Sequence, residues 1–496
     1  MDAILALCAA IPSLLLLRLI GAAIYNIYFH PLSNYPGPKF AAASRIPTVW
    51  YMIQGKNVQW VVSLHKKYGD VVRTGPDELS YTNAQGWRDI YGHRVRGKAS
   101  FLKNPTFFPK PPNGVDSLVA SSDEAHARAR RIFSHAFSDK ALREQEPLFQ
   151  KYVDLLLQKL TDAVQDPQQK CVVNMVNMYN FTTFDIMGDL TFGDSLQLLD
   201  HSDYSPWVAT IFQNIKAVTM MRATSYFPAV ENLLKLLIPK SLAEKRISHF
   251  KYSTDRVDKR LSANSEHQRP DIWGMILRQD EAKGLSLDEM HSNAAAFMIA
   301  GTETTATLLS GLTFLLLANP ESLAKLVHEI RGAFLTNDDI TIEHLMGLKY
   351  LNACLEEGLR MYPPVPIGTT RIVPPEGAAI CGKYVPGGIT VSVSHYSTYY
   401  SAENFALPNS FIPERWLGDP RFEADNKLAF QPFSYGPRNC LGKNMAYHEM
   451  RLILSKVLWN FDLSLTEESK NWSDQDVFTL WDKPPLMVKI TPVSKV

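Results

Sequence analysis

Residues 286–319 form the segment that most restricts how this chain can fold. Ser286 and Glu289 have the spacing of a capping box, and Asn319-Pro320 provides a stop, so one helix is predicted between them. After His291 the segment consists mostly of alanine, leucine, isoleucine, phenylalanine and threonine. At about 1.5 Å per residue this helix is roughly 45 Å long and apolar on most sides. We expect it to cross the middle of a large domain.

The rest of the chain favours a single large domain. Its 496 residues contain 46% hydrophobic and 20% charged types, with no fixed-period repeat and no low-complexity tract. The 51 basic and 50 acidic residues give no reason to expect nucleic acid as a partner. The cysteines are scattered and form neither a CxxC pair nor a zinc spacing, which favours a reducing compartment. They are Cys8, Cys171, Cys354, Cys381 and Cys440.

The amino-terminal stretch predicts a membrane anchor. From Ala3 to Phe29 the only charged residue is Arg18, and roughly 20 apolar residues are enough to cross a bilayer. A cleaved signal peptide is the alternative, but no basic residue precedes the run and the run is longer than a usual signal core. We therefore expect residues 1–29 to be an uncleaved transmembrane helix.

Charges after this stretch predict its orientation. Lys39 and Arg45 follow the apolar run, so the positive-inside tendency places the rest of the chain in the cytoplasm. Two glycosylation sequons, at Asn180 and Asn471, offer a test, because attached sugar would place the domain in the lumen. Residues 30–40 contain three prolines and predict a stiff tether, so the catalytic domain is expected over residues 41–496.

Residues Ala300 to Thr305 of the long helix read A-G-T-E-T-T. Gly301 costs about 1 kcal/mol relative to alanine in a helix interior, which suggests a special role. Helical threonines often bond to a carbonyl one turn earlier, so the polar groups could be purely structural. Alternatively, the carboxyl of Glu303 beside the hydroxyl of Thr304 could deliver protons to a ligand that approaches at the glycine.

The run F-S-Y-G-P-R-N-C-L-G spans Phe433 to Gly442. Apolar residues then recur with helical spacing, so Cys440 is predicted just ahead of a helix amino terminus, where a thiolate is favoured. Gly436 and Gly442 permit a tight turn and close approach to a flat ligand, and Arg438 can meet an anion. A lone cysteine is usually an inert buried thiol, and we interpret the other four in that way.

These residues resemble a known family. Phe433, Gly436, Arg438, Cys440 and Gly442 match the haem-binding loop of the cytochrome P-450 superfamily, and A-G-T-E-T-T is similar to its oxygen-activating helix. The resemblance implies a mainly α fold with a smaller β region, in one large catalytic domain after the anchor helix. It also implies haem b with Cys440 as the axial ligand of the iron, and Glu303 and Thr304 as catalytic acid and alcohol.

Further segments extend the resemblance from about residue 30 to about residue 460. Helix geometry favours Glu356 as the partner of Arg360, but the family pattern E-x-x-R selects Glu357. Arg415, in F-I-P-E-R-W, completes a Glu-Arg-Arg cluster that stabilises the haem side of the family's core. Without the resemblance, a solvated surface pair of little energetic value remains the simpler interpretation.

Three basic residues are implied to bind the haem propionates. His126 and Arg130, in H-A-R-A-R, lie one helical turn apart, and Arg371 is a third candidate. Arg128 and Arg131 fall outside this pattern and are expected to be solvated or to face a redox partner. A surface arginine at a strand end is the alternative for Arg371.

The resemblance implies a monooxygenase that inserts one atom of O2 into a lipophilic small molecule by hydroxylation, epoxidation or desaturation. The chain contains no G-x-G-x-x-G motif, so electrons are expected from a separate protein, and the resemblance implies a membrane-bound, NADPH-dependent flavoprotein reductase. A haem-thiolate isomerase or dehydratase and a haem sensor are the alternatives, but relatives of the first kind often lose the acid or the alcohol. We expect the protein at the endoplasmic reticulum membrane, facing the cytoplasm.

Apolar residues near the expected substrate pocket suit a lipophilic molecule, although apolar residues of a buried helix are usually core. The overall pattern resembles enzymes of secondary metabolism in filamentous fungi. The candidate pocket residues are Ala296, Phe297, Ile299, Ala300, Val365 and Ile367.

Overall fold

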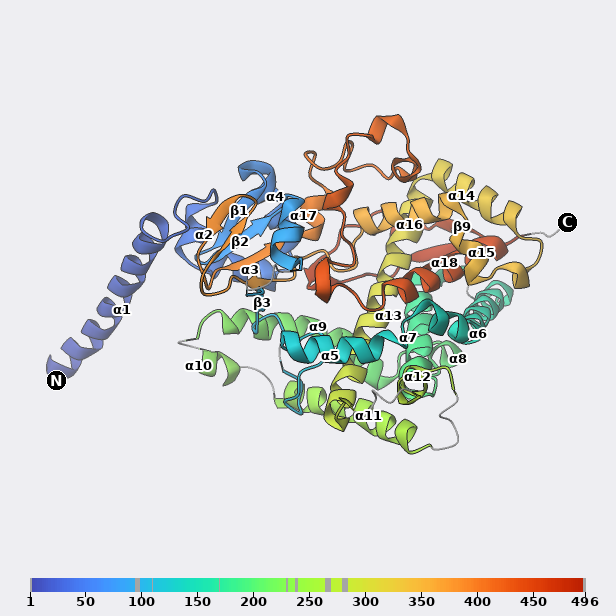
Figure 1. Ribbon diagram of the computed structural model, residues 1–496, viewed down its shortest axis with the longest axis horizontal. Coiled ribbons are helices and arrows are strands. Elements are labelled where there is room, and N and C mark those ends of the chain that lie inside the picture. Colours follow the sequence, from blue (N-terminus) through green and yellow to red (C-terminus); the bar gives the residue numbers. More distant parts are fainter. Residues whose placement is uncertain are drawn as a thin grey trace.

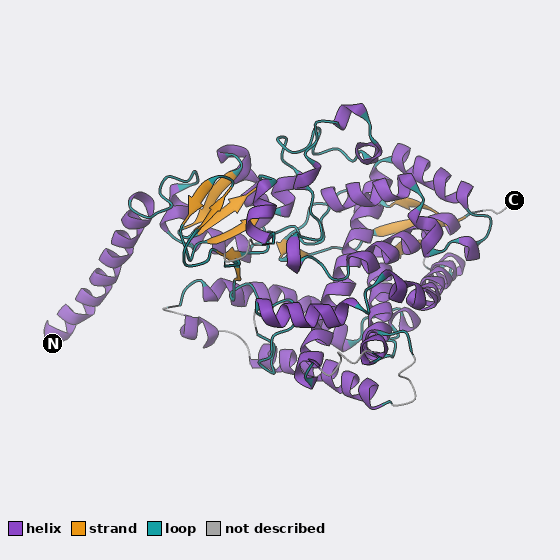
Figure 2. Ribbon diagram, in the orientation of Figure 1, coloured by secondary structure: helices purple, strands orange, loops and turns teal. Residues whose placement is uncertain are grey.

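The fold is mainly helical with a smaller β region, as expected from the family resemblance (Figures 1 and 2). The computed structural model describes residues 2–93, 99–108, 110–168, 170–228, 231–236, 240–263, 269–278 and 284–493. Helices fill one part of the molecule, and the larger sheet lies at the other end, near the amino terminus (Figure 2).

The first half of the chain contributes helices of very different length. They are α1 (Asp2–Tyr28), α2 (Lys39–Ala43), α3 (Ile46–Ile53), α4 (Asn57–Tyr68), α5 (Asp123–Ser134), α6 (Asp139–Gln165), α7 (Met175–Phe192), α8 (Leu198–His201), α9 (Pro206–Ser225), α10 (Glu231–Leu236) and α11 (Lys240–Ser262). The later helices are α12 (Ile272–Leu277), α13 (Leu287–Ala318), α14 (Pro320–Ala333), α15 (Ile342–Met346), α16 (Lys349–Met361), α17 (His395–Tyr399) and α18 (Lys443–Asn460).

The strands form one larger sheet and several small ones. The larger sheet has the order β1-β2-β8-β5-β3, and a three-stranded sheet has the order β4-β12-β9. Two hairpins, β6-β7 and β10-β11, complete the β structure of the described residues. The bounds are β1 Val71–Gly75, β2 Glu78–Tyr81, β3 Leu102–Lys103, β4 Val172–Asn174, β5 Arg371–Ile372, β6 Ala378–Ile380, β7 Lys383–Val385, β8 Thr390–Val393, β9 Phe461–Leu465, β10 Val477–Phe478, β11 Leu480–Trp481 and β12 Met487–Pro492.

Helix α13 confirms the prediction for residues 286–319. The Ser286 hydroxyl accepts from the N–H of Glu289 at 3.2 Å, and the Glu289 carboxylate accepts from the N–H of Ser286 at 2.8 Å. Pro320 begins the next helix, so α13 ends at Ala318. The helix crosses the middle of the molecule and packs against α7, α16 and α18 (Figure 1). Its apolar sides are buried because helices cover most of its circumference.

Helix α1 projects away from the body (Figure 1). Within the described ranges, no helix combines the length and the apolar character needed to cross a membrane. The transmembrane helix expected over residues 1–29 is therefore not supported.

The proline-rich segment 30–40 packs on the larger sheet. Leu32 is fully buried, and the N–H of Arg73 donates to the carbonyl oxygen of Pro36 at 2.7 Å. The segment expected to be a stiff tether therefore lies against β1. Leu32 packs in the apolar cluster of the larger sheet, and the carbonyl oxygen of Pro36 accepts a hydrogen bond from β1.

Candidate active site

Cys440 lies in a tight loop directly before α18, as predicted. The N–H of Cys440 donates to the carbonyl oxygen of Phe433 at 2.9 Å, which closes the loop. Gly436 has a φ of +75°, and a Cβ at this position would lie 2.0 Å from the carbonyl oxygen of Tyr91. Only glycine can therefore occupy position 436 without displacing backbone.

Opposing effects act on the Cys440 thiol. Burial raises its pKa, whereas the N–H of Gly442 and the charges of Arg130 and Lys443 lower it. Burial is the largest effect, so the helix amino terminus does not by itself favour the thiolate as we expected. Cys440 is nevertheless an exposed residue, which leaves open space beside it. A cation at the sulfur would deprotonate it, which fits a metal ligand.

Helix α13 contributes another wall with exposed side chains. Ile299 is 37% exposed and Ala300 is also exposed, although the helix is buried on both sides of them. Phe137 connects this wall to the cysteine loop, since its ring packs edge-to-face on Phe297 with centroids 5.6 Å apart. The same ring lies 3.9 Å from the position of a Cβ on Gly442. We infer that the open space lies between α13 and the loop.

Cations gather beside the loop. Strand β3 pairs with β5 so that Lys103 stands directly opposite Arg371, and like charges in that position are destabilising. Arg438 is close to both, and Asp123 is its ion-pair partner at 2.6 Å. Burial and the charges of Arg371 and Arg438 lower the pKa of Lys103 to about 6. A further anion bound among these side chains would reduce their mutual repulsion.

Other polar atoms of this cluster support the same conclusion. Burial, followed by the charges of Arg438, Arg130 and Lys103, lowers the pKa of His126 to about 4. Nη1 of Arg438 is buried and has no hydrogen-bond partner among the described residues. A buried guanidinium nitrogen normally binds an acceptor. Because haem b carries two propionates, the cluster fits the carboxylate edge of that cofactor.

Two of the predicted propionate ligands have specific protein contacts. Arg130 donates to the carbonyl oxygen and to Oδ1 of Asn439, at 2.6 and 2.5 Å, and thereby holds the residue before Cys440. Arg371 lies over the ring of Tyr91, with its guanidinium 5.2 Å from the centroid. Lys103 was not identified from the sequence, because only the pairing of β3 with β5 places it here.

The Glu-Arg-Arg cluster is fully buried. The Arg360 guanidinium lies 2.7 Å from the Glu357 carboxylate, and Arg415 lies 3.4 Å from the same group. Trp416 donates from its ring nitrogen to Glu357 at 2.9 Å, and Arg415 also pairs with Asp425. Neither Trp416 nor Asp425 was assigned a contact from the sequence. These contacts join α16 to the segment that leads to the cysteine loop.

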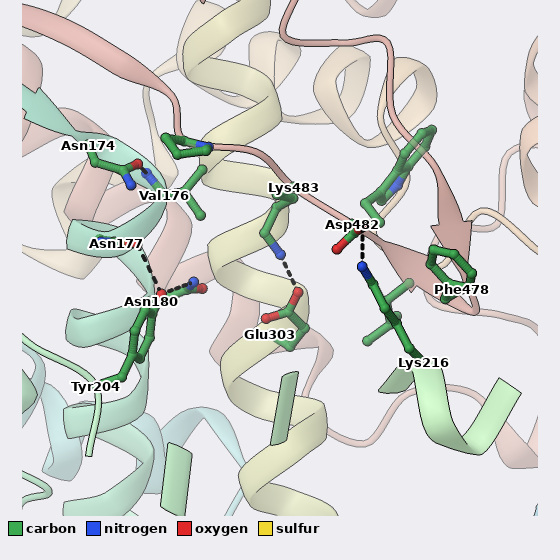
Figure 3. A pocket seen from close by; sticks show the side chains of 13 residues that line it. Asn174, Val176, Asn177, Asn180, Tyr204, Lys216, Glu303, Phe478, Asp482 and Lys483 are labelled. Atoms are coloured by element: carbon green, nitrogen blue, oxygen red, sulfur yellow. Dashed lines mark hydrogen bonds and ion pairs between the residues drawn. The ribbon is translucent and has the colours of Figure 1, made fainter. Parts of the chain in front are cut away.

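Glu303 and Thr304 have different surroundings. The Thr304 hydroxyl is half-buried and donates to the carbonyl oxygen of Ala300 at 2.6 Å, beside the open space. The Glu303 carboxylate is buried and forms an ion pair with Lys483 (Figure 3). Glu303 lines a separate cavity of about 360 Å³, whose wall also includes Asn180 and Tyr204.

Gly301 has a different role from the one expected. A Cβ at this position would lie 2.7 Å from the sulfur of Met187 on α7. The glycine therefore allows α7 and α13 to pack closely, and it does not open α13 to a ligand. Tight helix packing explains why a residue unfavourable in helices is tolerated there.

The candidate pocket residues differ in burial. Phe297 is buried and packs on Phe133 with ring centroids 4.9 Å apart, so it belongs mainly to the core. Ile367 lines a second, small cavity of about 40 Å³. Ala296 and Val365 are half-buried, and the exposed side chains are those of Ile299 and Ala300.

Comparisons with known proteins agree with this site. The family model for cytochrome P-450 matches residues 41–490. The cytochrome P-450 monooxygenase efuB of Hormonema carpetanum is 53% identical over 96% of this chain and 94% of its own length. The monooxygenase lcsI of Purpureocillium lilacinum is 47% identical over 97% and 94%. The monooxygenase astA of Talaromyces wortmannii is 46% identical over 95% and 94%.

These matches cover nearly the whole chain, including the cysteine loop and the central helix. The matches show that the chain is an oxidoreductase that incorporates oxygen. They also imply haem b held by a cysteine thiolate, with electrons supplied by a reductase partner. The chain therefore belongs to the cytochrome P-450 family.

Proposed function

We propose that this chain binds haem b through Cys440 and inserts one oxygen atom into a lipophilic small molecule. The observation that carries the proposal is the combination of an exposed cysteine directly before α18 with a group of basic side chains beside it, in which a buried guanidinium nitrogen of Arg438 has no acceptor among the described residues. One feature suits an iron ligand and the other suits the propionates. When bound, the haem supplies the iron chemistry that activates O2.

The chain's own residues position the cofactor. Cys440 is the proposed axial ligand, and Phe433, Gly436 and Gly442 shape the loop so that the flat macrocycle can approach. Arg130 holds the loop through Asn439. The proposed propionate ligands are His126, Arg130 and Arg371, together with Arg438 and Lys103. The cluster of Glu357, Arg360 and Arg415 fixes the polypeptide behind the loop.

The proposed proton relay uses Thr304 and Glu303. The hydroxyl of Thr304 donates to the carbonyl oxygen of the exposed Ala300, and by rotating it can instead donate a proton into the open space. Glu303 lies one residue earlier and lines the polar cavity of about 360 Å³. A carboxyl between a polar cavity and a hydroxyl is suited to move protons inward.

The proposed substrate is lipophilic. Ile299 and Ala300 face the open space, with Ala296, Val365 and Ile367 less exposed. An apolar wall with one hydroxyl excludes water and binds hydrocarbon surface. Hydroxylation, epoxidation and desaturation all fit this wall. Because the relatives come from filamentous fungi, we place the enzyme in fungal secondary metabolism.

The proposed partners are O2, a membrane-bound NADPH-dependent flavoprotein reductase and a lipid bilayer. Helix α1 carries a continuous set of exposed apolar side chains, among them Leu14, Leu17 and Leu19 at 65–68% exposure. We propose that these side chains contact the endoplasmic reticulum membrane, with residues 41–496 as the catalytic domain on its cytoplasmic side. Asn180 is buried and Asn471 is exposed, so sugar at Asn471 would contradict this orientation.

The test uses the full-length protein in the reduced state with carbon monoxide. We expect the red-shifted Soret band of a thiolate-ligated haem in the wild type, and its loss in Cys440→Ser. Cys381→Ser is the matched control, because Cys381 lies in the β6–β7 turn and should leave the band unchanged. A wild-type band typical of histidine ligation would overturn the assignment of Cys440.

A further inference from the structure

Lys483 reaches the central helix from a distant part of the chain. It follows β11 by two residues, and its side chain is only 4% exposed. Its ammonium group forms an ion pair with Glu303 and donates to the hydroxyl of Thr307 at 2.6 Å (Figure 3). A buried lysine is almost always paired, and here its partner is the proposed relay acid.

The two oxygens of the Glu303 carboxylate have different hydrogen-bond partners. Oε1 accepts hydrogen bonds from the ammonium group of Lys483 and from the hydroxyl of Thr307, the latter at 3.3 Å. Oε2 has no hydrogen-bond partner among the described residues. The carboxylate is therefore held by one oxygen, and the other remains available.

The cavity beside Glu303 can supply a partner for the available oxygen. Its volume is about 360 Å³, and its wall includes the amides of Asn174, Asn177 and Asn180. Oδ1 of Asn180 is also buried without a partner among the described residues. A cavity of this size with several polar groups in its wall is expected to hold water.

We propose that Lys483 is a positioning residue for the proton relay. It fixes one oxygen of Glu303, so that the other oxygen can exchange protons with water in the cavity. This inference rests on the role of Glu303 in the proposed function. Without the ammonium group, the buried carboxylate would lose its charged partner and would take up a proton or turn away.

The neighbouring residue provides a matched control. Asp482 belongs to the same segment but pairs with Lys216 of α9 at 2.6 Å, with exposures of 43% and 51% for the two side chains. Exposed pairs of this kind contribute little. Asp482→Asn therefore disturbs the segment without removing the contact to Glu303.

The experiment compares Glu303→Gln, Lys483→Met, Lys483→Arg and Asp482→Asn as full-length, haem-loaded enzymes. NADPH consumption is measured with the reductase, O2 and 7-ethoxycoumarin as the lipophilic probe. We expect a fall of roughly tenfold in Glu303→Gln and Lys483→Met. Lys483→Arg should recover most of the rate, because the adjoining cavity has room for the larger cation. Asp482→Asn should match the wild type.

A second readout does not depend on turnover. Infrared spectra of the resting protein should show an additional protonated carboxyl band in Lys483→Met, which disappears when Glu303→Gln is added. If Lys483→Met does not bind haem, Lys483→Gln provides the same comparison with a hydrogen-bond donor retained.

The outcomes separate the two proposals. An unchanged rate in Glu303→Gln would contradict the proposed role of Glu303 itself. The inference about Lys483 alone would be overturned if NADPH consumption fell in Glu303→Gln, while Lys483→Met kept the wild-type rate and showed no new infrared carboxyl band. Equal losses in Asp482→Asn and Lys483→Met would also overturn it, because they would show a general effect of the segment.

Discussion

The Arg360 guanidinium lies 2.7 Å from the carboxylate of Glu357, three residues earlier on α16, and both side chains are fully buried. Glu356, four residues earlier, instead accepts a hydrogen bond from Tyr447 at 2.8 Å. Arg360 also donates to the carbonyl oxygens of Tyr399 and Pro408, which holds its side chain on the Glu357 side of the helix. Tertiary contacts thus decide between two carboxylates that the helix alone would rank in the other order.

Glu357→Gln should lower the free energy of unfolding by about 3–5 kcal/mol. The reason is that Arg360 would keep a buried charge without its carboxylate. Urea unfolding followed by tryptophan fluorescence measures the difference. Lys325→Met, which removes the exposed pair with Glu414, should change stability by no more than about 1 kcal/mol. Equal effects in the two variants would contradict the special cost of the buried cluster.

Thr304→Ala should raise the fraction of NADPH electrons released as hydrogen peroxide several-fold. The Thr304 hydroxyl beside the open space is the proposed last proton donor. Without it, reduced oxygen would be released as hydrogen peroxide before its O–O bond is cleaved. Thr302→Ala is the control, since Thr302 donates to the carbonyl oxygen of Met298 at 2.5 Å but is completely buried. Peroxide release that is the same in both variants would count against the role of Thr304.

Arg438→Met should weaken haem retention by roughly 10- to 100-fold. A charge-assisted hydrogen bond to a propionate contributes about 1.5–3 kcal/mol, and each 1.4 kcal/mol is about tenfold. Transfer of haem to an acceptor apoprotein gives the rate of loss. Arg131→Gln, on the exposed side of α5, should lose haem at the wild-type rate. Unaltered retention in Arg438→Met would remove Arg438 from the proposed propionate ligands.

Glu449→Gln should make stability less dependent on pH. Burial raises the pKa of Glu449 to about 8, against a smaller opposing effect of a hydrogen bond with Thr305. The folded state therefore keeps a proton that the unfolded state releases above about pH 4.5, so wild-type stability falls as the pH rises towards 8. This group contributes at most about 1.4 kcal/mol per pH unit.

Urea unfolding of wild type and variant at pH 6 and pH 7.5 checks this expectation. The variant should gain stability relative to the wild type at the higher pH, because glutamine has no proton to release. A stability difference between the two proteins that does not change with pH would contradict it.

Local patterns in the sequence predicted several elements correctly. The capping box at Ser286 and the stop at Pro320 define α13, and the glycines around Cys440 define the loop before α18. These features could be read because short-range interactions within a few residues determine caps, turns and helical periodicity. The family motif also depends on such local spacing.

Tertiary structure alone decided the contacts between distant residues. Lys103 stands opposite Arg371 only because β3 pairs with β5, and Lys483 meets Glu303 only because the segment after β11 packs on α13. Gly301, which the sequence suggested as a point of ligand approach, instead packs on Met187 of α7. The physical reason is that burial and packing act between side chains far apart in the chain, whereas sequence patterns report only on neighbours.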